Sequence, residues 1–199
     1  MSDDLFNYND ADKQSNYELA PPGKYRLRVT VRPGSIEDDH LVPAKNGYTH
    51  HLALKYTIQG GEYDGTQLFD YITLKHSPNG RDLEGYELGP ASPQKVEGFQ
   101  TAVRLGRAKL RALLESAHAI NPNDNSAEAN AKRRVKDNDF LNLDGLEFWA
   151  HVDIRKGRDG YRDSNTIDFI ITPDLPDWPT ATQNAIVPRS QEFNDEIPY

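Results

Sequence analysis

The sequence predicts a predominantly β fold, between all-β and α+β, with five strands and one helix between the third strand and the fourth. Two observations predict it. Five segments alternate apolar and polar residues with period two, as half-buried strands require, and one segment repeats its apolar residues at helical spacing. Turn residues, above all Gly and Pro, separate these segments, so hairpins are expected where the separations are short.

The first strand is expected over residues 24–32, directly after the chain-breaking Pro21-Pro22-Gly23. Its inward set is Tyr25, Leu27, Val29 and Val31. Its outward set is Arg26, Arg28, Thr30 and Arg32, which indicates a solvated face.

A hairpin is expected over residues 48–74, with a glycine-rich turn at 60–65. The inward residues of its first strand are Leu52, Leu54, Tyr56 and Ile58, and those of its second strand are Leu68, Ile72 and Leu74. Phe69 and Tyr71 fall on the opposite face of the second strand. Two interpretations stay open: a platform on which nucleic-acid bases stack, or ordinary core on a sheet covered on both sides.

The helix is expected over residues 94–119, started by Ser92-Pro93, because Pro suits the first helical position. Residues 121–138 are polar and are expected to be flexible, and they end in a basic cluster of Lys132, Arg133, Arg134 and Lys136. From residue 94 to residue 136, nine bases stand against four acids; the bases are these four together with Lys95, Arg104, Arg107, Lys109 and Arg111. This region is either a solvated helix face or a phosphate-binding patch.

The last two strands are expected over residues 146–156 and 161–171, joined by a turn at 157–160. In the last strand, Ile167, Phe169 and Ile171 are expected to share one face. The order of strand, strand, strand, helix, strand, strand is that of the OB-fold, a Greek-key barrel that binds oligonucleotides on the face of its second and third strands. A generic α+β sheet is the alternative.

The charge of the chain is concentrated at its ends. The 199 residues carry a formal charge of −8, and residues 1–20 and 173–199 each contribute −4, from five acids and one base. We therefore expect an acidic flexible arm (1–20), a neutral OB-like domain (21–172) and a Pro-containing acidic tail (173–199), with disordered termini. A neutral domain can still present a basic face to DNA. No secretory signal or membrane span is visible, and the chain has no cysteine, so a cytoplasmic protein is expected.

No enzymatic motif is visible, so neither catalysis nor a metal or other cofactor is expected. The six histidines show no zinc-like spacing, and phosphate-loop, nucleophile-elbow and dinucleotide motifs are missing from the sequence. The alternative is a Mg²⁺ nuclease cluster made of Asp153, Asp159, Asp163 and Asp168. Tyr161 and Asn165 are interpreted as structural residues at a strand end.

Three blocks resemble a phage family long catalogued as a domain of unknown function, whose members are regarded as single-stranded-DNA-binding OB-folds of replication and recombination modules. The blocks are PPGKYRLRV at 21–29, GGEYDGTQLFDYITL at 60–74 and LDGLEFWAHVDIRKGRDGYRDSNTI at 143–167. The matching residues are Gly23, Tyr25, Gly61, Tyr63, Gly65, Leu68, Phe69, Tyr161, Asn165 and Ile167. The insert at 121–138 is longer and more basic than this pattern implies.

The C-terminal tip is a second signal. It consists of Asp195, Glu196, Ile197, Pro198 and Tyr199, and it resembles the acidic, aromatic-ended tip of bacterial single-stranded DNA-binding proteins. An aromatic ring can fill an apolar pocket while its α-carboxylate pairs with a cation and the flanking acids steer the approach. We expect this tip to bind replication and recombination proteins.

Together these features predict a non-enzymatic, sequence-independent single-stranded-DNA-binding protein. Bases are expected to stack on Phe69, Tyr71 and Trp149. Phosphates are expected to contact Arg26, Arg28, Lys55, Arg155, Lys156, Arg158 and Arg162. The alternative is an OB-like protein–protein adaptor without a DNA role. RNA in place of DNA and a homo-oligomer are both compatible with the sequence.

Overall fold

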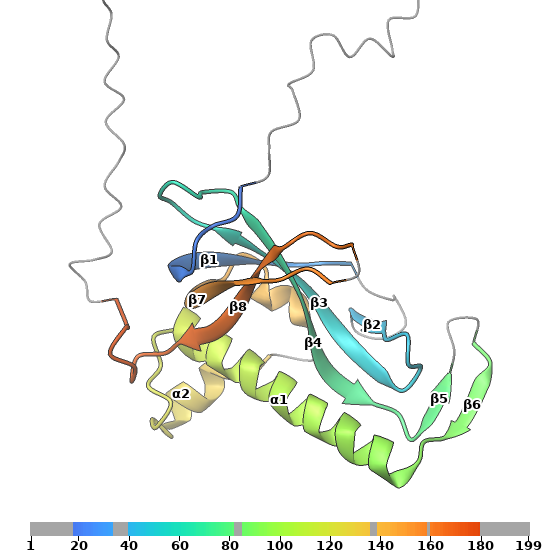
Figure 1. The fold of residues 1–199 in the computed structure, drawn as a ribbon. Coiled ribbons are helices and arrows are strands. Elements are labelled where there is room, and N and C mark those ends of the chain that lie inside the picture. The colour runs from blue at the N-terminus through green and yellow to red at the C-terminus, as the bar shows by residue number, and fades with distance from the viewer. Residues whose placement is uncertain (1–17, 34–39, 82–84, 136–138, 159, 180–199) are drawn as a thin grey trace, which may run out of the picture.

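The computed structural model describes residues 18–33, 40–81, 85–135, 139–158 and 160–179, and shows a curled antiparallel sheet with one long helix beneath it (Figure 1). The strands are β1 Gly23–Val31, β2 Leu41–Pro43, β3 Thr49–Ile58, β4 Gln67–His76, β5 Asn79–Arg81, β6 Glu87–Pro90, β7 Glu147–Arg155 and β8 Ser164–Ile171. The helices are α1 Pro93–Ala117, α2 Ala127–Lys132 and a 3-10 turn, Phe140–Leu143.

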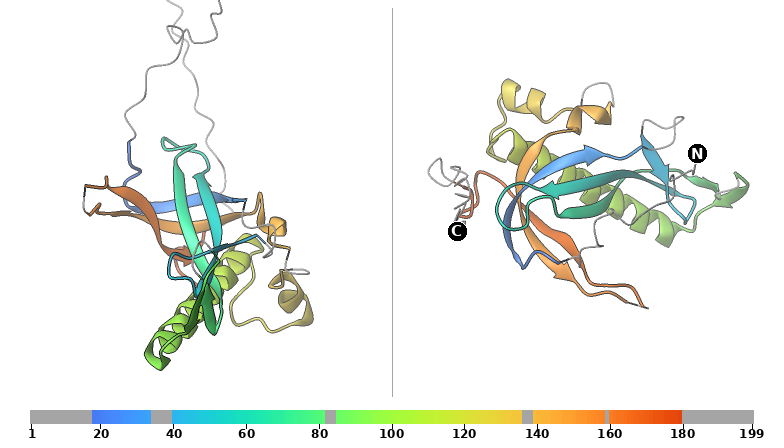
Figure 2. Two further views of the ribbon diagram at one scale, coloured as in Figure 1. Left: turned by 90° about the vertical axis from the view of Figure 1, so that its right-hand side faces the viewer. Right: turned by 90° about the horizontal axis from the view of Figure 1, so that it is seen from above.

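The main sheet is antiparallel throughout, in the order β4-β3-β1-β7-β8, with the short β2 pairing with β3 beyond the end of β1. The sheet curls until its edge strands, β4 and β8, are in contact (Figure 2). Among the described residues no hydrogen-bonded ladder joins β4 to β8. The sheet is therefore barrel-like but open along one seam between β4 and β8.

The inward faces of β1, β3, β4 and β7 form the core as the alternation predicts. The fully buried side chains include Leu27, Val29, Leu52, Leu54, Tyr56, Ile58, Leu68, Ile72 and Phe148. The phase predicted for β8 is wrong. A β-bulge sets Phe169 opposite His151 but Ile167 opposite Val152, so Ile167 and Phe169 lie on opposite faces. Ile170 and Ile171 are both buried, while Phe169 is exposed.

Helix α1 begins at Pro93, as predicted, after the N-cap Ser92. It packs against β4 at Gly106, where an added Cβ would overlap the carbonyl oxygen of Thr73. The predicted placement of the helix needs correction, because three short strands were not predicted. Counting β2, β5 and β6, α1 follows the sixth strand of the chain and not the third.

A polar contact joins β3, β4 and α1 inside this packing. The hydroxyl of Tyr56 donates to Asp70 at 3.2 Å, and Asp70 forms an ion pair with Lys109 of α1 at 2.6 Å. Burial, and then the Asp70 carboxylate, raise the pKa of Tyr56 well above its usual value of 10.0. Asp70 occupies an inward-facing position of β4, and its carboxylate is satisfied there by Tyr56 and Lys109.

The part of the 121–138 insert that the structure describes is ordered, contrary to expectation. Arg133 bonds Glu115 of α1 at 2.7 Å and donates to the carbonyl oxygens of Asn121 and Asp124. A buried guanidinium therefore ties the loop and α2 to the end of α1.

Within the described residues, no helix combines the length and the apolar character that crossing a membrane requires. The predicted arm lies almost wholly outside the described residues, as do residues 180–199 of the tail.

Candidate nucleic-acid interface

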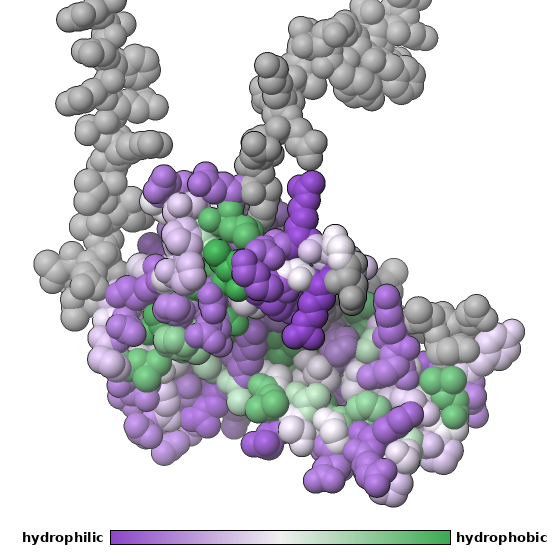
Figure 3. Space-filling model, viewed as in Figure 1, coloured by the Kyte–Doolittle hydropathy of each residue, from purple (hydrophilic) through white to green (hydrophobic). Residues whose placement is uncertain are grey.

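Two aromatic rings are exposed on the outward face of β4. Phe69 is 57% exposed and Tyr71 is 55% exposed, so neither is core, and the interpretation of a sheet covered on both sides is wrong at this strand. Figure 3 shows patches of apolar residues directly beside strongly hydrophilic ones on one face of the molecule. Unpaired bases stack on exposed aromatic rings such as these two.

A single cation, Arg32, contacts both residues of this aromatic pair. The guanidinium of Arg32 lies 5.5 Å from the ring centre of Phe69, and it donates to the hydroxyl of Tyr71 at 3.3 Å. Lys55 lies directly opposite Phe69 on β3 and forms no ion pair with any described residue. We call Phe69, Tyr71, Arg32 and Lys55 the platform. The sequence placed Arg32 on the outward face but did not identify it as a site residue.

The open seam between β4 and β8 is hollowed beside the platform. One hollow of about 520 Å³ is lined by Gly65, Gln67, Leu68, Phe69, Arg155, Ser164 and Asn165. A second hollow, of about 780 Å³, is lined by Arg155, Lys156, Gly157, Arg158, Tyr161, Arg162 and Ser164. Arg155 and Ser164 line both hollows, so the two adjoin and are treated together as one groove. We call it the seam groove.

The cations of the seam groove differ in how they are held. Lys156 pairs with Asp163 at 2.7 Å, and this hydrogen bond raises the pKa of Lys156 and lowers that of Asp163. Arg155, Arg158 and Arg162 form no ion pair with any described residue. Within the described part of the chain, three of the four predicted basic residues here therefore have no carboxylate that would compete with an anionic ligand.

Two residues interpreted as structural have different surroundings. Asn165 is buried and bonds both backbone groups of Ala20, at 3.0 and 2.7 Å, which confirms its structural role. Tyr161 is 81% exposed at the rim of the seam groove, so its structural interpretation is wrong. An aromatic residue within a turn rich in Gly and Arg is a sign of surface exposure, and this signal in the sequence could have identified Tyr161 as a surface residue.

The structure does not bring the remaining predicted residues to the seam groove. Arg26 and Arg28 both pair with Glu147 of β7, Arg28 at 2.6 Å, so one carboxylate offsets part of their charge. Trp149 is half-buried on β7, and its backbone N–H donates to Ser116 of α1 at 3.0 Å. Trp149 lines neither hollow of the seam groove.

In the basic cluster at the end of the insert, two of the three bases that the structure describes are paired with carboxylates. The Arg133 side chain is only 9% exposed and bonds Glu115, and Lys132 pairs with Glu128 at 2.8 Å. Arg134 is exposed, and Lys136 lies outside the described residues.

No group of three or more potential metal ligands occurs among the described residues. In the alternative nuclease cluster, Asp163 is bonded to Lys156 and to the backbone N–H of Gly157, and Asp168 lies 3.9 Å from His151. Asp159 lies outside the described residues, as does the tip of residues 195–199. A comparison with protein families, curated proteins and solved structures found no match to this chain.

Proposed function

We propose that this chain binds single-stranded DNA without sequence preference and catalyses no reaction. One observation carries the proposal: two exposed rings on β4 adjoin a groove lined by three arginines that lack a carboxylate partner among the described residues. Every base has a face that can stack on such a ring, whatever its identity, while arginines bind the phosphates between bases.

The position of these residues in the fold supports the proposal. Taken in chain order, the five long strands are β1, β3, β4, β7 and β8, and the third and the fifth meet at the open seam. We assign this arrangement to a partly open OB-like barrel. OB-folds bind oligonucleotides on their second and third strands and with the loop between strands four and five. Here these are the platform and the β7–β8 part of the seam groove.

We further propose a biological setting from the sequence resemblance. The protein would protect single-stranded DNA in the cytoplasm of a phage-infected cell. Its segment 195–199 would recruit replication or recombination proteins, because an aromatic ring preceded by acids suits an apolar pocket rimmed by cations.

Fluorescence anisotropy of labelled oligo-dT over a salt series tests the DNA-binding proposal. The logarithm of affinity should fall linearly with that of salt, by about 0.7 per phosphate contact. Replacing Arg155, Arg158 and Arg162 by Gln should reduce the slope of log affinity against log salt by about 2, because three phosphate contacts of about 0.7 each are lost. Duplex DNA of equal length is the comparison ligand, and it should bind more weakly because its bases are already stacked.

Two outcomes contradict the proposal. Wild-type protein that binds no oligo-dT at low salt would leave the adaptor function as the better explanation. Binding that ignores both the three arginine substitutions and those at Phe69 and Lys55 would show that the contacts lie elsewhere.

A further inference from the structure

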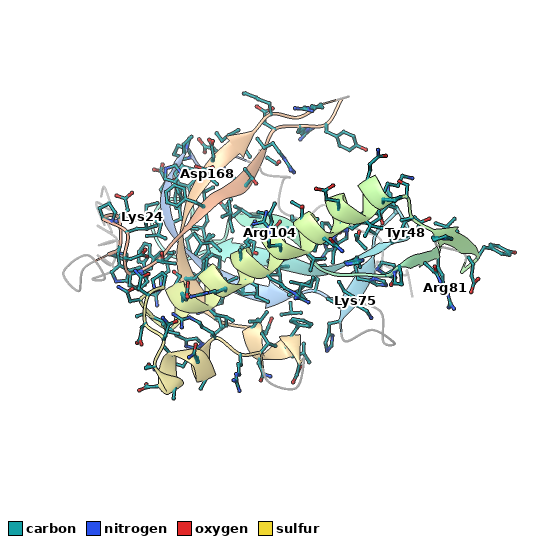
Figure 4. The ribbon with its side chains drawn as sticks, turned by 90° about the horizontal axis from the view of Figure 1, so that it is seen from below. Lys24, Tyr48, Lys75, Arg81, Arg104 and Asp168 are labelled. Atoms are coloured by element: carbon teal, nitrogen blue, oxygen red, sulfur yellow. The ribbon has the colours of Figure 1, made fainter. Side chains whose placement is uncertain are left out.

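Apart from the two hollows of the seam groove, a basic hollow lies between the end of β4 and the middle of α1. Its volume is about 450 Å³, and it is lined by Leu74, Lys75, His76, Gln100, Val103, Arg104 and Arg107. Figure 4 shows Arg104 on α1 and Lys75 on the neighbouring strand. We call it the helix groove. It shares no lining residue with the seam groove.

The charged side chains that line the helix groove are all basic. Its lining includes Lys75, Arg104 and Arg107 and no carboxylate. Arg104 and Arg107 are exposed, stand about one helical turn apart on the same side of α1, and form no ion pair with any described residue. Two neighbouring guanidinium groups without a carboxylate partner suit phosphate oxygens, which they can bind in a bidentate manner.

The helix groove begins where the exposed row of β4 ends. Phe69, Tyr71 and Thr73 alternate along the outward face of that strand. A β-bulge then sets Thr73 opposite His51 but Lys75 opposite His50, so Lys75 turns away from that face and lines the helix groove. From Gln67, which lines the seam groove, to Lys75 the strand extends about 27 Å, at about 3.4 Å per residue. The seam groove, the platform and the helix groove therefore follow one strand in succession.

The close packing of α1 places the two arginines at this end of β4. Gly106 lies between them in the sequence and touches the carbonyl group of Thr73, where any side chain would overlap. The backbone of α1 can therefore approach β4 closely, and Arg104 and Arg107 flank the point of contact.

We propose that the helix groove binds the phosphate backbone of the same single strand, beyond the bases stacked on the platform. This inference rests on the proposed function and extends its site: the bound strand runs along β4 with phosphates held at both ends. A stacked strand with 3.4 Å per nucleotide would place about eight nucleotides along β4, and an extended strand fewer. Contact with the helix groove should therefore matter for long oligonucleotides and not for the shortest.

The test compares Arg104→Gln/Arg107→Gln with wild type on oligo-dT of about 4 and about 20 nucleotides, lengths that bracket the site sizes of OB-folds. For the long ligand, the salt slope should fall by about 1.4 and the affinity about tenfold at physiological salt, because two phosphate contacts are lost. For the short ligand, binding should change less than about twofold. The matched control is Lys95→Gln/Arg134→Gln, which removes the same charge from exposed positions outside both grooves.

Unchanged binding of the long ligand by the arginine variant overturns the inference, and so does an equal loss for both lengths. A peptide of residues 192–199 that binds wild type but not the variant, while DNA binding is unaffected, would make the groove a peptide site and also overturn it. The proposed function survives each of these results as long as the seam-groove substitutions weaken DNA binding. Only wild-type protein that binds neither oligonucleotide defeats both.

Discussion

The proposed stacking of bases depends most directly on Phe69 and Tyr71. Because both rings are more than half exposed, truncating either should change the free energy of unfolding by about 0.5 kcal/mol or less. The loss of a stacked base should weaken oligo-dT binding by about 1–3 kcal/mol, which is roughly 5-fold to 150-fold. Anisotropy titrations of Phe69→Ala and Tyr71→Ala, with thermal melts of the same samples, measure both quantities.

The matched control is Tyr86→Ala, which removes a ring that is 69% exposed on the segment before β6, away from the platform. It should bind oligo-dT like wild type. Equal weakening in all three variants would mean that exposed aromatic rings act non-specifically, and platform variants that bind normally would remove stacking at β4 from the mechanism.

His51 adds a pH dependence next to the platform. Its Nδ1 lies 3.0 Å from the hydroxyl of Thr73, and its ring meets that of Tyr71 edge-on. Burial, and then the neighbouring His50, lower the pKa of His51 below 6.5, so it is neutral at pH 7. As pH falls through that lowered pKa, one positive charge appears beside Tyr71 and oligo-dT should bind about fourfold more tightly, the equivalent of one phosphate contact at physiological salt.

Binding of oligo-dT measured at about pH 5 and about pH 8 tests this effect. The substitution His51→Gln should remove the part of the pH-dependent gain in affinity that comes from His51. The stability effect has the opposite sign. Because the folded pKa is the lower one, the unfolded chain binds the proton first below about pH 6.5, and acid therefore destabilises the wild-type fold through His51. An identical pH response in the variant would assign the titration to another group.

At the scale of single residues, the sequence predicted side-chain direction better than side-chain partners. Period-two alternation placed Phe69, Tyr71 and Lys55 on the outward face. It could not show that Arg32 reaches over Phe69. Nor could it show that Glu147 offsets part of the charge of Arg26 and Arg28, because these contacts join segments that are far apart in the sequence. Arg133 was the clearest error, since a basic residue in a polar run gives no sign that a buried glutamate on another helix will pair with it.

Among the elements, the contact between α1 and β4 is the one most sensitive to a single methyl group. Gly106→Ala would push a Cβ into the Thr73 carbonyl oxygen, so the helix must shift, and we expect a loss of about 1–3 kcal/mol in the free energy of unfolding. Gly98→Ala is the matched control on the same helix. Nothing lies within 4 Å of its added Cβ, so Ala should stabilise the protein by up to about 1 kcal/mol.

Urea denaturation of the two variants measures these changes. Opposite signs would confirm that close approach, and not helix propensity, explains Gly106. Stabilisation by both substitutions would show that α1 can move away from β4 without cost, and the placement of Arg104 and Arg107 beside β4 would lose its structural basis.

Long elements were predictable, and short ones were not. Strands of eight to ten residues, such as β3, β4 and β8, contain several alternation periods, and α1 has 25 residues of helical spacing behind a Ser-Pro start. Strands β2, β5 and β6 have only three or four residues and contain Gly or Pro, which indicate turns. The bulge in β8 has no local signal either, because Ile167, Phe169 and Ile171 keep an unbroken alternation through it.

At the scale of the whole molecule, the candidate site depends on closure of the sheet. The seam groove combines residues 65–69 with residues 155–165, which come together only because β4 and β8 are the two edges of one curled sheet. The sequence predicted the strands that do this, and it predicted the basic β7–β8 turn. It could not predict a groove, since the distance between two edge strands is set by the curvature of all the strands between them.

The distribution of charge over the whole chain leads to the last prediction. The chain carries −8, and the eight residues 192–199 hold three acids, Glu192, Asp195 and Glu196, and no base. Tethered acids compete with DNA phosphates for the same cations, and the competition weakens as salt screens it. A protein lacking residues 192–199 should therefore bind oligo-dT more tightly than the full chain at low salt, with the difference shrinking as salt increases. Full-length Asp195→Asn/Glu196→Gln should reproduce most of the gain if charge is responsible. Equal affinity of all three proteins across the salt series would mean that the tail does not reach the cationic grooves, and its acids would then act only on a protein partner.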